Sequence, residues 1–195
     1  MRFLIQSTEL RRLLSTVASI APKKASNPVE SCILLQAHEG GLRVTATDKA
    51  MTYIGTFTAN VEDPGEVAID AANALHVAKV LPDDVVSVQL GDNYRLDVKC
   101  RKSAYKLSGQ AATDFPPAPP LDTAGTLAID AADLRKIIDQ THFSIAPDDN
   151  RYGLNGAHLD AVDTPAGRML RMVGTDGNRL SWAQAPFTGT LAIGR

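Results

Sequence analysis

The chain contains no apolar run that approaches the roughly 20 residues a membrane-spanning helix needs. It also lacks the pattern of a secretory signal, because Arg11 and Arg12 follow the short apolar opening instead of preceding it. The two cysteines, Cys32 and Cys100, have no CxxC partner, which favours two small buried side chains over a disulfide or a metal site. These absences predict a cytoplasmic protein with no membrane partner.

Catalytic motifs are missing as well. The sequence has no Gly-rich phosphate loop, no metal-ligand spacing among its histidines and no Ser or Cys in a nucleophile motif. The acidic pairs at 83–84 and 148–149 are typical of solvated loops. We therefore expect a protein that is not an enzyme and that uses no metal and no cofactor.

Two aspartates leave one enzymatic alternative open. Asp48 and Asp176 each follow a threonine, at a point where a strand is expected to enter a turn. An aspartate in such a place commonly accepts hydrogen bonds from nearby backbone amides, and its occurrence as a matched pair favours this structural role. The alternative is a metal-dependent nuclease that uses the two carboxylates.

A short sequence motif of about five residues, called the repeated phrase below, recurs along the chain at a nearly constant period. Its copies begin at Phe3, Val67, Leu127 and Leu191, so that successive starts are 64, 60 and 64 residues apart. Self-similarity of this kind indicates a repeated structural unit. Because the fourth copy has only five residues, we expect the chain to be a fragment of a longer ring- or array-forming protein.

Alternate units share a longer resemblance. Three segments of the first unit have counterparts in the third, namely 9–12 and 133–136, 20–22 and 145–147, and 42–48 and 170–176. Their offset grows from 124 to 128 residues, as expected if insertions collect in loops. The proline-rich stretch 115–120 is stiff and extended, and we place a domain boundary there. The prediction is two similar domains, a first one at 1–120 and a truncated second one at 121–195.

Each unit is expected to form a strand, a short helix and three further strands. The apolar face of the first helix is Leu10, Leu13, Leu14 and Val17, and that of the third is Leu134, Ile137 and Ile138. Ser7 or Thr8 is expected to cap the first helix, and the second, at about 71–81, ends before Pro82. The strands are expected at 31–37, 42–47, 52–59, 85–90, 94–100 and 104–107. This pattern predicts the α+β class with antiparallel sheets.

Positive charge recurs on the helices although the net charge of the chain is −2. The residues are Arg11, Arg12, Arg135 and Lys136 at matching positions, Lys79 on the helix between, and Lys23 and Lys24 after the first helix. One interpretation is an ordinary solvated helix face. The other, favoured by the recurrence in register, is an arrangement around an axis in which the helices present one basic surface. Such a surface would bind phosphates without reading bases, and more weakly as salt rises.

Four short strings add a resemblance to a known family. They are 113–116 (Thr-Asp-Phe-Pro), 143–144 (Phe-Ser), 151–156 (Arg-Tyr-Gly-Leu-Asn-Gly) and 175–180 (Thr-Asp-Gly-Asn-Arg-Leu). With these strings, the chain resembles the bacterial β sliding clamp, the processivity subunit of the DNA polymerase III holoenzyme. The similarity runs from residue 1 to residue 195.

The resemblance implies a DNA-clamp fold, with antiparallel sheets outside and helices lining the inner face. Clamps of this family have three domains per chain, and two chains close head to tail into a homodimeric ring around double-stranded DNA. The ring tethers the replicative polymerase, confers processivity and does not read sequence. This chain would supply the first domain and about half of the second.

The resemblance also implies two kinds of site. A hydrophobic pocket takes up short linear peptides from the polymerase catalytic subunit and the clamp loader. The matching residues here are Leu154, Thr175, Gly177, Asn178, Arg179 and Leu180, with Asn178 standing where histidine is common. Rim loops that contact DNA match Lys24, Arg151 and Tyr152. The alternative to a ring is an interaction module that does not encircle DNA.

Overall fold

The computed structural model describes residues 1–22, 28–118, 127–147 and 154–190. The chain divides into two compact units, Met1–Pro119 and Pro120–Arg195, and each is described by itself. Among the described residues, no helix is long and apolar enough to cross a bilayer. The fourth copy of the repeated phrase and the end of the proline-rich stretch lie outside the described residues.

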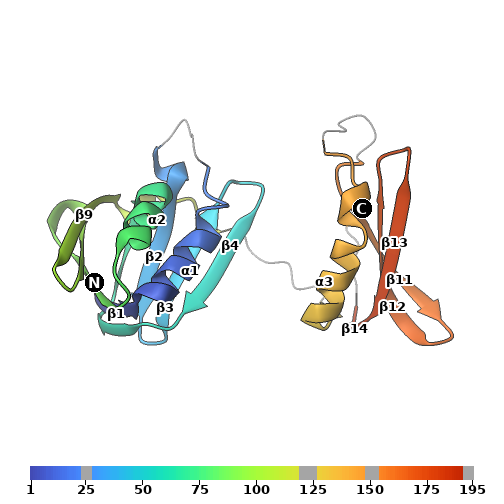
Figure 1. The fold of residues 1–195 in the computed structure, drawn as a ribbon, viewed down its shortest axis with the longest axis horizontal. Helices are drawn as coiled ribbons and strands as arrows, with labels where there is room; N and C mark the ends of the chain where they lie inside the picture. Colours follow the sequence, from blue (N-terminus) through green and yellow to red (C-terminus); the bar gives the residue numbers. More distant parts are fainter. Residues whose placement is uncertain (23–27, 119–126, 148–153, 191–195) are drawn as a thin grey trace. The chain divides into compact units, whose positions relative to one another are not determined.

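The described part of the first unit comprises two α-helices and nine strands (Figure 1). In chain order they are β1 (Arg2–Gln6), α1 (Ser7–Val17), β2 (Cys32–His38), β3 (Gly41–Thr47), β4 (Thr52–Phe57), β5 (Asn60–Asp63), β6 (Gly65–Asp70), α2 (Ala71–Val80), β7 (Val85–Leu90), β8 (Arg95–Cys100) and β9 (Ser103–Gln110). Three short 3₁₀ helices lie at Pro28–Ser31, Asp92–Tyr94 and Ala112–Asp114. Two successive strand, helix and three-strand units are therefore present, with β5 as an addition that the sequence did not predict.

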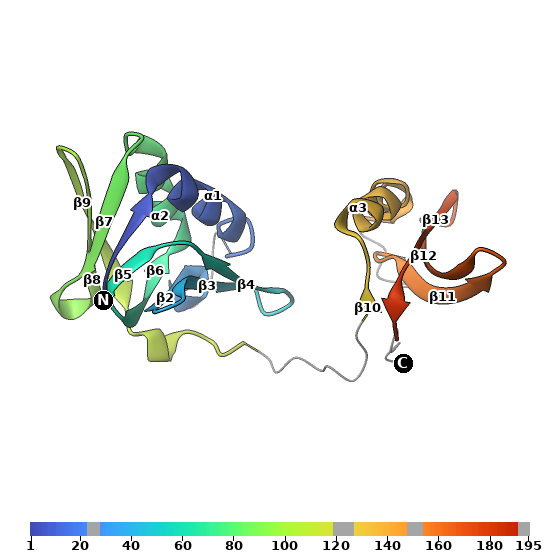
Figure 2. The ribbon, with the colours of Figure 1, turned by 90° about the horizontal axis from the view of Figure 1, so that it is seen from below.

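The nine strands form one antiparallel sheet in the order β4-β3-β2-β6-β9-β8-β7-β1-β5. The two halves exchange their opening strands: β1 pairs with β7 of the second half, and β6 pairs with β2 of the first. Figures 1 and 2 show α1 and α2 side by side on one side of this sheet. Each half therefore needs the other to complete its sheet.

The buried face of α1 confirms the predicted apolar stripe. Leu10, Leu13, Leu14 and Val17 are all buried against the sheet in one continuous core. Burial of such a stripe is the main source of stability for a helix this short. The second helix, α2, buries smaller side chains, and it ends one residue earlier than expected, at Val80.

The repeated phrase has a physical reason in two of its copies. Asp70 accepts a hydrogen bond from the Asn73 amide at 2.7 Å and caps α2, and Asp130 caps α3 in the same way. The first copy has Gln6 at this position, and its side chain makes no capping bond. The expected cap by Ser7 or Thr8 is wrong, because both residues already lie inside the helix.

The second unit repeats half of this arrangement. Its elements are β10 (Leu127–Ala128), α3 (Ala131–Asp139), a 3₁₀ helix (His142–Ser144), β11 (His158–Thr164), β12 (Gly167–Thr175), β13 (Leu180–Pro186) and β14 (Thr188–Gly189). Strands β11, β12 and β13 form an antiparallel sheet with β12 in the centre, and β10 pairs with β14. Helix α3 packs on the sheet through Ile137, but Ile138 is 40% exposed, so the expected apolar stripe is narrower than predicted. The opening strand has two residues instead of about five.

Candidate nucleic-acid interface and peptide site

Arg12 is the more exposed arginine of α1. Its side chain is 68% exposed, and Nη2 lies 2.9 Å from the Glu9 carboxylate one turn earlier. The guanidinium also stands 5.6 Å from the centre of the Phe57 ring, a cation–π contact. Arg12 therefore presents its charge at the surface with one acidic neighbour.

Arg11 lies differently from the solvent-facing position expected for it. Its side chain is only 32% exposed, and it forms an ion pair with Asp83, in the loop between α2 and β7. The same guanidinium donates to Ser7 Oγ at 3.3 Å, and its Nε is buried without a partner among the described residues. Arg11 thus connects the first turn of α1 to a loop 72 residues away in sequence.

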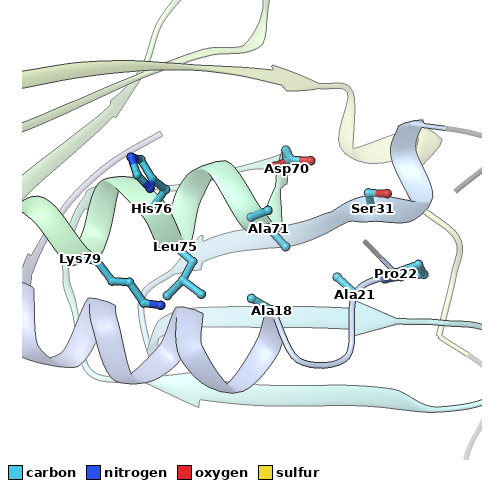
Figure 3. A pocket seen from close by; sticks show the side chains of 10 residues that line it. Ala18, Ala21, Pro22, Ser31, Asp70, Ala71, Leu75, His76 and Lys79 are labelled. Atoms are coloured by element: carbon cyan, nitrogen blue, oxygen red, sulfur yellow. The ribbon is translucent and has the colours of Figure 1, made fainter. Parts of the chain in front are cut away.

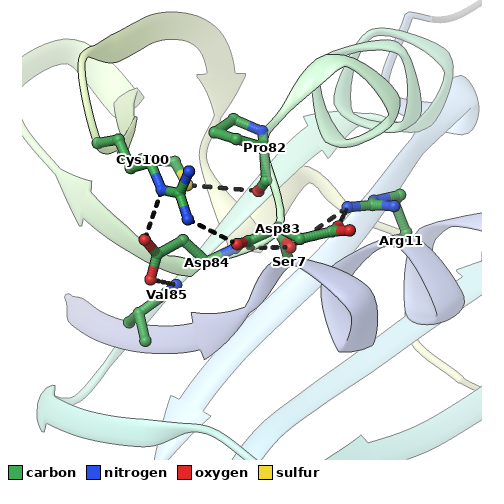
Figure 4. A network of polar contacts seen from close by, with 8 residues as sticks. Ser7, Arg11, Pro82, Asp83, Asp84, Val85 and Cys100 are labelled. Carbon is green, nitrogen blue, oxygen red and sulfur yellow. Dashed lines mark hydrogen bonds and ion pairs between the residues drawn. The ribbon is translucent and has the colours of Figure 1, made fainter.

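The loop that carries Asp83 is held from two sides (Figure 4). On one side, the Ser7 amide donates to the Asp84 carbonyl at 3.0 Å, and the Asp84 amide donates to Ser7 Oγ at 3.3 Å. On the other, Arg101 Nε donates to the Asp84 carboxylate at 2.6 Å and Nη2 to the Asp83 carbonyl at 3.2 Å. The Arg101 hydrogen bond holds the pKa of Asp84 below its usual value. The acidic pair at 83–84, predicted to be merely solvated, therefore joins three elements.

Lys79 lies on α2 and is exposed, with no hydrogen bond or ion pair to another described residue. It stands beside a hollow of about 400 Å³ between α1 and α2 (Figure 3). The other lining residues are mostly small, namely Ala18, Ala21, Pro22, Ser31, Asp70, Ala71, Ala72, Leu75 and His76. Among the described residues, Lys79 is therefore a cation without an ion pair at the border of a mostly apolar hollow.

Helix α3 carries acids together with its bases. Arg135 is exposed and lies 3.7 Å from Asp139, one turn later, and Lys136 is also exposed. With Asp130 at the cap and Asp133 in the first turn, three acids accompany two bases. The basic stripe predicted for this helix is thus locally balanced by carboxylates.

The prediction of a basic surface rested on the cations of these helices and left their acids out of the charge balance. Glu9 with Arg12 and Arg135 with Asp139 stand at the i, i+3 and i, i+4 spacings that pair on a helix, so these two could have been found. The Arg11–Asp83 pair had no sequence signal. The predicted residues Lys23, Lys24, Arg151 and Tyr152 lie outside the described residues.

The two aspartates of the nuclease alternative occupy the same kind of turn. Each accepts hydrogen bonds from the amides two and three residues further on, at 2.9 and 2.6 Å for Asp48 and at 3.0 and 3.0 Å for Asp176. The preceding threonine donates to the carbonyl four residues on, at 2.9 Å from Thr47 and 2.7 Å from Thr175. The hydrogen bonds confirm the predicted structural role. Within the described residues, no cluster of three or more acids, histidines or cysteines is arranged to hold a metal ion.

Five of the six predicted pocket residues lie in the turn between β12 and β13 or at the strand ends that flank it. Arg179 Nε donates to the Asp176 carboxylate at 2.9 Å, and the guanidinium stands 5.9 Å from the centre of the Phe143 ring. Leu180 is 64% exposed at the start of β13. The sixth residue, Leu154, is partly buried, and its carbonyl accepts from the Ala146 amide at 3.1 Å.

Two exposed aromatic residues accompany this turn. Phe143 is exposed beside Arg179, and Trp182 is exposed two positions after Leu180, on the same side of β13. Neither was among the predicted site residues, although Phe143 stands in one of the strings that carried the resemblance. The turn therefore combines a fixed guanidinium with unburied apolar side chains, a composition suited to a peptide with apolar and acidic groups.

Comparison with known proteins decides the family. The family model for the N-terminal domain of the DNA polymerase III beta subunit matches residues 1–119, and the model for its central domain matches residues 128–191. The chain belongs to the DNA polymerase III beta subunit family. The expected resemblance is thereby confirmed over both units.

Curated relatives of this beta subunit family are named Beta sliding clamp. The protein from Caulobacter vibrioides is 32% identical over 188 residues, which are 95% of this chain and 50% of the relative. The protein from Vibrio cholerae is 34% identical over 193 residues, 98% of this chain and 52% of the relative. The chain spans about half the length of the curated relatives it matches.

Solved structures of sliding clamps share the fold. A DNA polymerase sliding clamp from Caulobacter crescentus matches with a TM-score of 0.85 and 32% identity, over 95% of this chain and 51% of that one. A sliding clamp from Bartonella birtlesii, bound to griselimycin, matches with a TM-score of 0.86 and 25% identity, over 95% of this chain and 50% of that one. The predicted α+β clamp fold is confirmed.

Proposed function

We propose that this chain is the first half of a non-catalytic sliding clamp, which encircles duplex DNA and tethers the replicative polymerase. The observation that carries the proposal is the match of two consecutive beta subunit domains, in order, to nearly the whole chain. The mechanism is topological: a closed ring leaves DNA only by opening, so it needs no tight contacts. In this proposal residues 1–120 are the first clamp domain and residues 121–195 belong to the second.

The helices α1, α2 and α3 are proposed to face the duplex. Arg12, Lys79, Arg135 and Lys136 place exposed cations on them, and among the described residues each of the four has either no acid or a single acid within ion-pair distance. Partly balanced charges attract phosphates weakly and without preference for a base sequence. Weak contacts of this kind allow the protein to slide.

The partners follow from the same proposal. This chain spans about half the length of its relatives, and a ring would also require the other half. We propose that two full-length chains close the ring as a homodimer. The polymerase catalytic subunit and the clamp loader would dock short peptides on the β12–β13 turn, against Arg179 and Leu180. The cytoplasm, where bacterial chromosomes replicate, is the proposed compartment. The second candidate, a module that does not encircle DNA, has no observation in its favour.

The proposed helix contacts can be tested on this chain with a charge-reversal pair. Arg12→Glu with Lys136→Glu changes two exposed helix cations. Each lost phosphate contact lowers the slope of log affinity against log salt by about 0.9, so we expect a loss approaching about 1.8 on a short duplex. Fluorescence anisotropy over a range of salt concentrations measures this slope.

The control for this test changes two exposed cations on strands, Arg43→Glu with Lys99→Glu. It alters the net charge equally and leaves the helices intact. If the control pair loses as much slope as the helix pair, the helices do not form the DNA-facing surface. Circular dichroism of both variants establishes that the fold is retained.

A further inference from the structure

We propose that Asp83 is a positioning residue that withholds Arg11 from DNA, and so limits how tightly the helix face of the first unit grips a phosphate. The inference rests on the proposed function, because it concerns the same helix face. It begins from an asymmetry between neighbouring arginines: the counter-ion of Arg12 comes from its own helix, whereas that of Arg11 comes from a separate loop.

The carboxylate of Asp83 is presented by a backbone that is already fixed. The amide and hydroxyl of Ser7 hold the loop on one side, and the guanidinium of Arg101 holds it on the other, through the Asp83 carbonyl and the Asp84 carboxylate (Figure 4). Because the Asp83 carboxylate is held next to Arg11, its effective concentration there is high, and it competes with a DNA phosphate for the guanidinium. Arg11 therefore meets its intramolecular partner before it meets a phosphate from solution.

The exposed carboxylate of Asp83 makes an exchange of partners physically possible, although the Arg11 side chain itself is only 32% exposed. The Asp83 side chain is 75% exposed, so the outer side of the ion pair is open to an incoming anion. Ion pairs that are this exposed are weak and are screened by salt, and a DNA phosphate can displace the carboxylate. Arg11 keeps its second acceptor, Ser7 Oγ, during such an exchange. Asp83 thus lowers DNA affinity without abolishing the contact.

A limit on affinity suits a protein that must move along DNA. Each additional cation that binds a phosphate strengthens attachment and steepens the dependence on salt. With Asp83 in place, Arg11 is bound to a DNA phosphate for only a fraction of the time. Asp83 therefore lowers the affinity for DNA, whereas the exposed cations of the helices raise it.

The test removes the charge of Asp83 and keeps its size. Asp83→Asn is compared with Asp92→Asn, which makes the same change of net charge on the exposed β7–β8 turn, where no described residue forms an ion pair with Asp92. In a salt titration of binding to a short duplex, we expect Asp83→Asn to steepen the slope by up to about 0.9, the contribution of one phosphate contact. Equal slopes for the two variants would overturn the inference.

A second measurement follows Arg11 directly. The Nε–Hε signal of Arg11 in ¹H–¹⁵N NMR spectra is recorded during a titration with inorganic phosphate, for the unaltered chain and for both variants. We expect a larger shift, at lower phosphate concentration, only in Asp83→Asn. A response that is the same in all three proteins would contradict the proposed competition.

The outcomes separate this inference from the proposed function. If the unaltered chain binds duplex with a salt-dependent affinity that Arg12→Glu with Lys136→Glu reduces, the helix face contacts DNA. Equal behaviour of Asp83→Asn and Asp92→Asn then removes the inference about Asp83 alone. If the helix substitutions have no effect on binding, the proposed DNA-facing surface fails and the role of Asp83 fails with it.

Discussion

At the scale of single residues, two tasks of the carboxylates stand out beside helix capping. Glu9, Asp83 and Asp139 lie beside helix arginines and moderate their charge. Asp48 and Asp176 bind backbone amides and close turns of the same geometry in the two units. The second task has a consequence for the pH dependence of stability.

Asp176 is expected to make the stability of the second unit sensitive to acid. The amides of Arg179 and Asn178, with smaller help from the Arg179 guanidinium, hold its pKa below the usual value. A group whose folded pKa is depressed stabilises the fold above its unfolded pKa, about 3.9, and this stabilisation is lost as the pH falls through the folded value. The free energy of unfolding of the second unit should therefore decrease over that acidic range.

Substitution isolates this contribution. Asp176→Asn should lower the stability of the second unit at neutral pH and reduce its dependence on acid, because one of its depressed carboxyls is gone. Asp160, whose pKa is also held down by the Arg171 hydrogen bond, still titrates in this variant. Asp163→Asn, on the exposed edge of β11, provides the matched change of charge. Urea unfolding at several pH values measures both. An acid dependence that survives Asp176→Asn unchanged would contradict this assignment.

At the scale of elements, the repeated phrase is explained by helix capping. The aspartate of the Ile-Asp-Ala-Ala string caps α2 and α3, whereas α1 begins after Gln6 without a side-chain cap. Asp70→Ala should cost about 1 kcal/mol of unfolding free energy, the usual loss for an N-cap, and Gln6→Ala should cost much less. Denaturant unfolding of the two variants measures the difference. Equal losses would mean that the repeat has another cause.

The elements also show what could be predicted from the sequence. Alternation and turn residues placed β7 at the residues observed, and the helical spacing of α1 predicted its buried face, because local pattern and burial agree there. Strand β5 was missed because its four residues are mostly exposed and are held by pairing with β1, a contact that is not local. Strand β10 has the same cause of error. Its sequence repeats the earlier copies, but the strand has only two residues because the length of a strand depends on its partner, here β14.

The candidate site was predicted in the same uneven way. The string 175–180 gave the β12–β13 turn and its Arg179, since consecutive residues of a turn stay together in space. The partial burial of Arg11 and its pairing with Asp83 could not be predicted, because the two residues belong to different halves of the first unit, which are brought together by the strand exchange. Contacts that arise from the strand order join residues far apart in the chain, and no characteristic spacing in the sequence reveals them.

At the largest scale, the chain is built by duplication. Two units with matching helices and matching Thr-Asp turns correspond to two consecutive beta subunit domains, and the first of them is complete as an interlocked pair of halves. In the proposed ring, DNA would be held by enclosure and not by affinity. This distinction can be measured.

The most direct measurement is the residence time of the full-length protein on circular and on linear duplex DNA, after loading by its own clamp loader. Enclosure predicts that the protein stays on a closed circle at a salt concentration that abolishes simple binding, and that it leaves soon after the circle is cut. Equal residence on circular and linear DNA would show that the protein is held by contacts alone, and would contradict the proposal of a sliding clamp.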